Sequence, residues 1–288
     1  MPLVSVIIPT HNRPEFLQRA ISSVLSQTVS DFEVIVVDDG DRESGAEDIV
    51  SSFNDSRIQY VPQLRPHSGA PVARNRGVEE SHADLVAFLD DDDEWLPQKL
   101  ERQLTLLSKE GDRVGFCFSA VVNVYDDREE KTEIEDGRGD FSGVALRRFN
   151  GFMTSTLIVR RDVFKEVGGF DESFPSHQEA ELMIRLAERC EGVGISEALT
   201  RMSISQTRAH IGGDINRRIQ GREMLFAKYR ERYVARPRVL AQHYFWFAFI
   251  YRDAGKKEEA LDALWRAWTL HHRLLYLSRY VAFRIFGR

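Results

Sequence analysis

The chain has 288 residues, of which 42% are hydrophobic and 29% are charged, and its formal net charge is −6. This is the composition of an ordinary soluble globular protein, with room for one large domain or for one domain and a small appendage. The acidic balance excludes a nucleic-acid-binding surface that spreads over the whole protein.

Residues 4–90 alternate between strand and helix patterns. Short β-branched or apolar runs predict strands, and apolar residues at helical spacing predict helices. In chain order we expect a strand at Val4–Ile8 ended by Pro9, a helix from Pro14, a strand at Phe32–Val37, a helix near 44–53, a strand at Ile58–Val61, a helix at Ala70–Glu80 and a strand at Ala83–Leu89. This order predicts an α/β fold, in which flanking helices cover a doubly wound, mostly parallel sheet with right-handed crossovers.

The middle of the chain is less regular. We expect strands at Val114–Tyr125 and Ser155–Val159, a charged loop or hairpin at 126–140, and helices at Arg161–Val167 and Glu179–Arg189. From about residue 215 the pattern is helical. The sequence therefore predicts two domains, residues 1–212 and residues 213–288.

The predicted helical extension, residues 213–288, contains two patterns. Residues 244–267 resemble one tetratricopeptide-like helical hairpin. Residues 273–288 combine apolar side chains with four arginines, which suits a basic amphipathic helix that lies on an anionic membrane surface. A docking helix for the core, or for a second subunit in a homodimer, is an equally open alternative.

Four carboxylates, Asp90 to Asp93, directly follow the apolar run that ends at Leu89. Adjacent carboxylates repel each other and are costly to desolvate, and a strand end is where an open α/β sheet binds ligands. A hard divalent cation would relieve the repulsion and turn the cluster into a diphosphate clamp. The alternative is a solvated turn with a helix cap before Pro97.

Two further polar turns follow the first two predicted strands, at residues 9–14 and 38–40. The first offers a flat ring and a cation, in front of a helix N-terminus that favours phosphate. The second offers carboxylates that can accept a hydrogen bond from a nucleobase. Because the carboxyl ends of parallel strands meet at one edge of a sheet, we expect all three turns to form one site.

At this point the chain resembles a known family. The segments VSVIIPTHNR (4–13) and VVDDG (36–40) resemble the opening of the family 2 glycosyltransferases, which have the GT-A fold. ARNRG (73–77) and FLDDDDEW (88–95) are similar to two further motifs of that family, in order and at suitable spacing. GGFDE (168–172) and EAELMIRL (179–186) resemble its acceptor-side segment, so the resemblance covers roughly residues 3–212.

The resemblance implies a nucleotide-diphospho-sugar donor and inversion at the anomeric carbon. Carried over by position, the residues that line the nucleotide pocket are Thr10, His11, Asn12 and Arg13. Asp39 would read the base edge, and Arg74 would help to hold the nucleotide.

The resemblance also implies a divalent metal, Mn²⁺ or Mg²⁺. The acidic run carries the family's Asp-X-Asp motif as Asp90 and Asp92, with Asp91 between them. Asp92 would bind the metal, Asp90 would contact the ribose or metal-bound water, and Asp91 belongs with the nucleotide site. His210 is a candidate ligand of the metal or diphosphate, with a structural or exposed histidine as the alternative.

Glu179 matches the family's general-base position, at the start of a helix. The family more often has Asp there, so the longer Glu must sit back by ~1.5 Å, one carbon–carbon bond. Glu181 and Glu172 are rivals for the role. The alternative for Glu179 is a first-turn acid that the helix dipole favours.

These residues predict a metal-dependent inverting glycosyltransferase of cell-surface polysaccharide biosynthesis. It would move a sugar from a nucleotide donor, with uridine as the expected base, to a glycan, lipid-linked or protein-linked acceptor. A catalytically inactive nucleotide-sugar-binding module of a glycan assembly complex is the alternative. A sugar nucleotidyltransferase ranks last, because residues 9–13 contain no glycine for a phosphate loop.

The sequence favours a cytoplasmic protein. Its two cysteines, Cys117 and Cys190, give neither a disulfide framework nor metal-ligand spacing. No apolar run reaches the ~18 to 20 residues of a membrane span, and the first residues lead into a strand without a signal-peptide pattern. Peripheral contact with the inner face of the membrane would come through residues 273–288.

Overall fold

The computed structural model describes residues 1–134, 136–147, 152–204 and 214–286. These residues divide into two compact units. Unit 1 contains residues 1–172 and 179–204, and unit 2 contains residues 173–178 and 214–286. The predicted domain boundary between residues 212 and 213 lies outside the described residues.

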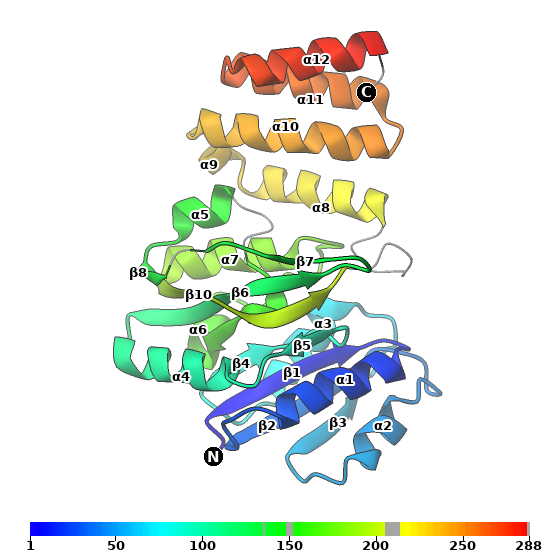
Figure 1. Cartoon of the computed structure of the whole chain (residues 1–288), viewed down its shortest axis with the longest axis vertical. Helices are drawn as coiled ribbons and strands as arrows, with labels where there is room; N and C mark the ends of the chain where they lie inside the picture. The colour runs from blue at the N-terminus through cyan, green and yellow to red at the C-terminus, as the bar shows by residue number, and fades with distance from the viewer. Residues whose placement is uncertain (135, 148–151, 205–213, 287–288) are drawn as a thin grey trace. The chain divides into compact units, whose positions relative to one another are not determined.

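The described part of unit 1 is built around a ten-stranded sheet, in the order β3-β2-β1-β4-β9-β6-β10-β5, with β7 beside β6 and β8 beside β10 (Figure 1). Its strands are β1 (Val4–Thr10), β2 (Phe32–Asp38), β3 (Ile58–Pro62), β4 (Leu85–Phe88), β5 (Asp93–Trp95), β6 (Val114–Val124), β7 (Glu129–Lys131), β8 (Gly137–Gly139), β9 (Ile158–Arg160) and β10 (Glu191–Ser203).

The connecting helices of unit 1 are α1 (Pro14–Leu25), α2 (Ala46–Ser52), α3 (Ala70–Glu79), α4 (Lys99–Glu110), α5 (Ser142–Arg147), the 3-10 helix η1 (Thr154–Thr156), α6 (Arg161–Glu166) and α7 (Gln178–Arg189), whose first residue belongs to unit 2. All strands and helices expected before residue 90 are present.

The predicted parallel arrangement holds for β3, β2, β1 and β4. The other half of the sheet is mixed. Strand β9 runs antiparallel to both β4 and β6, whereas β10 is parallel to β6. The charged segment 126–140 supplies β7, which forms a hairpin with β6, and β8, which pairs with β10.

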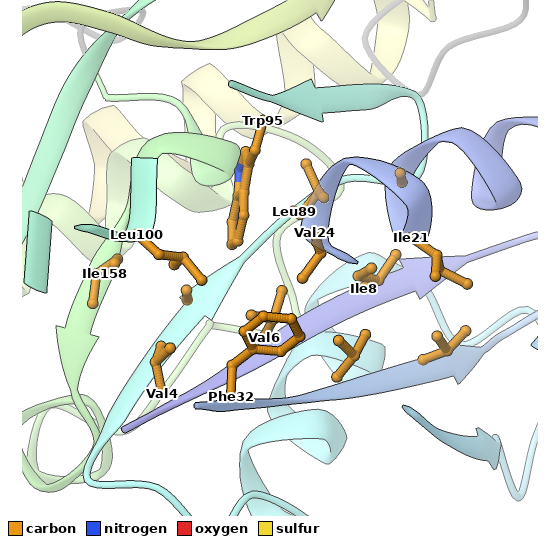
Figure 2. Close-up of a cluster of buried hydrophobic side chains, with 14 of the residues drawn as sticks. Val4, Val6, Ile8, Ile21, Val24, Phe32, Leu89, Trp95, Leu100 and Ile158 are labelled. Carbon is orange, nitrogen blue, oxygen red and sulfur yellow. The ribbon is translucent and has the colours of Figure 1, made fainter. Parts of the chain in front are cut away.

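The sheet is covered on both faces because β1 is apolar on both sides. Val6 and Ile8 belong to a buried cluster that includes Ile21 and Val24 of α1 (Figure 2). Ile7, the residue between them, faces α3, where a Cβ added to Gly77 would lie 2.3 Å from the Ile7 Cγ2 atom. Two-residue alternation along the strand produces this division.

Unit 2 contains the helices α8 (Ile215–Lys228), α9 (Arg230–Val234), α10 (Pro237–Asp253), α11 (Lys257–Leu270) and α12 (Leu274–Phe286). The Asp214 side chain caps α8 by accepting hydrogen bonds from the backbone N–H groups of Asn216 and Arg217. The helices α10, α11 and α12 share a core of small and aromatic side chains, in which Ala260, Ala263 and Ala267 allow close packing. Among the described residues, every helix is too short or too polar to cross a bilayer.

Candidate functional site

The three polar turns meet at the carboxyl-terminal edge of β1, β2 and β4. Arg13, after β1, donates to Asp91 Oδ1 at 2.5 Å and to Asp92 Oδ2 at 3.0 Å, both after β4. Thr10, at the end of β1, donates to Asp91 Oδ2 at 2.8 Å. The structure therefore brings Thr10, Arg13 and the acidic run together, as the sequence predicts.

The carboxylates of the acidic run alternate between the interior and the surface. The side chains of Asp90 and Asp92 are 30% and 16% exposed, whereas the Asp91 side chain is fully buried. Burial raises the pKa of Asp91 to about 7, against the attraction of Arg13. Asp91 is therefore an internal support of the turn, and Asp90 and Asp92 are its outward-facing groups.

Asp93 also points inward, and it begins β5. Its Oδ2 atom accepts a hydrogen bond of 2.5 Å from Ser155 Oγ, and burial raises its pKa well above the usual range. The same hydroxyl accepts a hydrogen bond from the Asp90 N–H at 3.1 Å. Ser155 thus ties both ends of the acidic run to η1. The helix-cap alternative is wrong for Asp93, because the residue before α4 is Gln98.

His11 and Asp39, the two residues expected at the nucleobase, lie next to each other. His11 Nδ1 donates to the Asp39 backbone carbonyl at 3.0 Å, and the ring meets His67 edge-on at 4.8 Å between centroids. The Asp39 carboxylate accepts the N–H groups of Ser68 and Gly69, at 2.8 and 2.7 Å. Each carboxylate oxygen keeps a further lone pair that could accept from a ligand.

Asn12 closes the loop between β1 and α1. Its backbone adopts φ +53°, a left-handed conformation that Asn tolerates better than most residues. Its side chain donates to Asp41 Oδ2 at 2.8 Å and accepts from the Asp41 N–H at 2.9 Å. The sequence pattern gave no signal for His67 or Asp41, because both lie in loops of ordinary turn composition.

Arg74 is 5% exposed and lies on α3. It donates to Asp90 Oδ1 at 2.5 Å, and its guanidinium lies 5.3 Å from the centre of the Phe170 ring. Its buried Nε atom has no hydrogen-bond partner among the described residues. Arg74 is therefore a fixed cation with a spare donor beside the outward-facing Asp90.

Glu179 lies in the first turn of α7, and its charge interacts with those of Arg74 and Asp90. It borders a small apolar cavity together with Phe118, Phe152, Phe170, Leu182 and Met183. Burial raises the pKa of Glu179, with a smaller opposing effect from Arg74. A carboxylate with a raised pKa next to an arginine and an aspartate is a candidate general base.

The two rivals of Glu179 have other partners. Glu181 is buried and forms a two-pronged ion pair with Arg185, including a 2.8 Å hydrogen bond from Arg185 Nε. Glu172 accepts a hydrogen bond of 2.9 Å from the Asn75 side chain. Asn75 also holds the backbone of Phe170 through both its amide atoms. The geometry therefore favours Glu179 over Glu181 and Glu172.

The donor set at the acidic run suits a hard divalent cation. Among the described residues, no group of three or more His, Cys, Asp or Glu side chains converges to hold a metal. Mg²⁺, however, commonly takes one or two carboxylates and completes its shell with substrate phosphates and water. Asp90 and Asp92 fit an ion that arrives with a diphosphate. The other expected ligand, His210, lies outside the described residues.

Residues 5–168 match the model of the glycosyl transferase family 2. The amylovoran biosynthesis glycosyltransferase AmsB of Erwinia amylovora is 35% identical over 191 residues, which cover 63% of this chain and 62% of that protein. The putative teichuronic acid biosynthesis glycosyltransferase TuaG of Bacillus subtilis is 43% identical over 108 residues, which cover 37% and 42%.

An uncharacterized glycosyltransferase of Rickettsia bellii is 34% identical over 204 residues, which cover 70% of this chain and 29% of that protein. The match with each of these three relatives thus spans less than two thirds of the relative's own length.

The crystal structure of residues 1–349 of S. aureus TarS is similar to this chain with a TM-score of 0.69 at 16% identity, covering 94% of this chain and 81% of that one. The same protein in complex with UDP-GlcNAc gives a TM-score of 0.64 at 16% identity, covering 93% and 73%. A likeness at this level of identity shows the fold alone, and the predicted GT-A fold with a helical extension is confirmed.

Proposed function

The chain belongs to glycosyl transferase family 2, and from that premise we propose that it transfers a sugar, with inversion, from a nucleotide-diphospho-sugar to a hydroxyl of an acceptor. The observation that carries the proposal is the convergence of Arg13, Arg74, Asp90, Asp92 and Glu179 at one edge of the sheet. Cations for a diphosphate and a carboxylate with a raised pKa are the groups that this transfer requires.

We propose uridine as the donor base. TarS, whose fold this chain shares, has been crystallised with UDP-GlcNAc and with UDP. In this chain, the His11 ring can stack on a pyrimidine, and Asp39 keeps acceptor capacity toward a base N–H. His67, in edge contact with His11, would form the second wall of the base site.

On the donor side, the leaving group is a nucleoside diphosphate whose negative charge grows as the sugar departs. Arg13 and Arg74 are positioned to balance that charge in a partly dehydrated site, where such balance contributes several kcal/mol. Mn²⁺ or Mg²⁺, held by Asp92 with Asp90 nearby, would supply further charge stabilisation to the diphosphate. Ser155 and Thr10 keep the acidic run in place through Asp93 and Asp91.

On the acceptor side, Glu179 takes the proton of the attacking hydroxyl. A base is most effective when its pKa lies near the working pH, and the apolar cavity moves the pKa of Glu179 in that direction. The positive charge of Arg74 opposes this rise in the pKa of Glu179. This environment also argues against an inactive binding module, in which position 179 would need no tuned carboxylate.

We propose a glycan or lipid-linked glycan as the acceptor, and polysaccharide assembly as the setting. The support is the naming of two relatives for amylovoran and teichuronic acid biosynthesis. A protein-linked acceptor remains the less supported alternative.

Turnover of a donor panel with UDP-, GDP- and dTDP-sugars, with and without Mn²⁺, tests the proposal. Glu179→Gln is expected to bind the nucleotide normally and to lose transfer by ~10²–10⁴-fold. Glu188→Gln, on the same helix, is the matched control and is expected to keep full activity. Full transfer by Glu179→Gln would remove Glu179 as the base, and donor binding without any turnover would favour the binding module.

A further inference from the structure

Helix α12 has a buried face and an outward apolar face. Tyr276 and Phe283 are 3% and 6% exposed, and they join the core shared with α10 and α11. On the opposite side, Leu274, Val281 and Ile285 recur at helical spacing and are 77%, 43% and 65% exposed. We call these three residues the apolar stripe. In Figure 1, α12 is the last helix of unit 2, alongside α11.

Exposed basic side chains lie to both sides of the apolar stripe. At 3.6 residues per turn, Arg284 is about 80° from it on one side, and Arg279 is about 140° from it on the other, toward the buried face. Among the described residues, no carboxylate forms an ion pair with either of them, and Arg284 donates to the Tyr280 hydroxyl at 3.0 Å. The sequence from residue 263 to 288 contains five arginines and no acidic residue, although the whole chain has a net charge of −6.

Aromatic rings complete this surface. The Trp265 ring of α11 is 47% exposed and lies 5.4 Å from the Tyr280 ring of α12. Trp and Tyr rings with one polar end favour the boundary between lipid headgroups and acyl chains. The nearest acidic residue before this region, Asp262, pairs with Arg266 at 2.6 Å.

We propose that α12 docks the protein on an anionic lipid bilayer, with the apolar stripe inserted among the acyl chains and Arg279 and Arg284 at the level of the phosphates. A helix with exposed apolar residues, basic flanks and no acidic residue is the form that lies in the interface plane. Because Tyr276 and Phe283 hold the other face of α12 in the core of unit 2, the proposed contact is with the surface of the bilayer. The inference does not depend on the proposed transfer chemistry.

A second copy of the chain is a less suitable occupant of the apolar stripe. A twofold contact along α12 would bring Arg279 and Arg284 against the same residues of the other copy, with no acidic residue on the helix to pair with them. Like charges facing each other across an interface are costly. An anionic membrane satisfies both the apolar and the basic groups.

Flotation of the full chain with vesicles of phosphatidylcholine alone, or of phosphatidylcholine mixed equally with phosphatidylglycerol, tests the proposal. The protein is expected to float with the anionic vesicles only, and less as salt is added. Each arginine near an anionic surface contributes about fivefold to binding, so Arg279→Gln/Arg284→Gln should bind roughly 25-fold more weakly. Val281→Gln/Ile285→Gln should lose roughly tenfold or more.

Arg230→Gln/Arg238→Gln is the matched control, because it removes the same charge from exposed positions on other helices of unit 2. It should float like the unaltered protein, and donor turnover should be the same in all these variants. Absence of flotation, or equal flotation of the α12 variants, would overturn the proposal. So would a dimer in sedimentation equilibrium that Val281→Gln/Ile285→Gln dissociates while the vesicles remain unbound.

Discussion

The buried Asp91 predicts a specific dependence of stability on pH. Its pKa is raised from 3.8 to about 7 by burial. The folded protein therefore binds this proton more tightly than the unfolded chain. The contribution of Asp91 to stability is complete below pH ~4, declines as the pH rises, and is lost above pH ~7. Asp91→Asn removes the titrating group and should remove this part of the pH dependence.

The magnitude follows from the size of the pKa change. About three pKa units at 1.36 kcal/mol each give about 4 kcal/mol between pH 4 and pH 7. No discount for solvent applies to Asp91, because its side chain is fully buried. The unaltered protein should therefore lose about 4 kcal/mol of stability between pH 4 and pH 7 that Asp91→Asn does not lose. The free energy of unfolding of Asp91→Asn minus that of the unaltered protein should rise by this amount over that range and stay constant at higher pH.

Urea denaturation at half-unit steps of pH from 4 to 8, in the presence of a chelator, measures the difference directly. Asp112→Asn, at an exposed position before β6, is the control and should show no such trend. A difference between Asp91→Asn and the unaltered protein that is independent of pH would refute the reasoning, because it would mean that Asp91 is ionised in the folded state throughout.

Three further outcomes are expected. Burial raises the pKa of Glu179, and a general base must be ionised to accept a proton, so the rate of sugar transfer should rise with pH through that pKa and then level off. A transfer rate that does not change with pH in the acidic range would count against Glu179 as the base. Ser155→Ala should lower the free energy of unfolding by about 2 kcal/mol, because it removes the hydroxyl that binds the Asp90 N–H and the buried Asp93 carboxyl group. Ser108→Ala, on the exposed face of α4, is the control and should change the free energy of unfolding little. Gly77→Ala should lower the free energy of unfolding, measured in urea, by about 1–3 kcal/mol, because the new Cβ would lie 2.3 Å from Ile7 Cγ2. Gly143→Ala, where a Cβ would meet no atom within 4 Å, should lower it much less.

Local sequence patterns were sufficient to predict which turns of the chain form the site. Three polar turns after three parallel strands had to meet at one edge. The contacts of Arg13 with Asp91 and Asp92, and of His11 with the Asp39 carbonyl, show that they do. The expected end of the first strand at Pro9 is wrong, because β1 continues to Thr10. Ile7 is paired with Phe88, the last residue of β4. Two residues further along β1, the nitrogen of Pro9 points to the same side as that of Ile7, beyond the end of β4. The N–H that proline lacks therefore costs the sheet no hydrogen bond.

The remaining parts of the site depend on contacts between distant segments, and no local pattern encodes them. Ser155 supports the acidic run from η1, and the N–H groups of Ser68 and Gly69 occupy the Asp39 carboxylate. Such partners become visible only once the fold is known. Strand alternation could not give the inward direction of Asp91 and Asp93 either, because Asp90 to Asp93 form a turn in which the Asp93 N–H donates to the Asp90 carbonyl at 3.0 Å.

The electrostatic balance of the site explains how four consecutive aspartates can stand together. Burial raises the pKa of Asp91 to about 7 and that of Asp93 well above its usual range, which disfavours the charged forms of both carboxyl groups. Asp90 and Asp92 form ion pairs with Arg74 and Arg13.

Under the proposed function, the diphosphate of the donor would compete with Asp90 and Asp92 for their two arginines. Release of these carboxylates from their ion pairs would leave two outward-facing anions beside the diphosphate, at the place where a divalent cation gains most from binding. Under the proposed function, the arginines that pair with Asp90 and Asp92 would thus favour joint binding of the diphosphate and a cation over binding of either one alone.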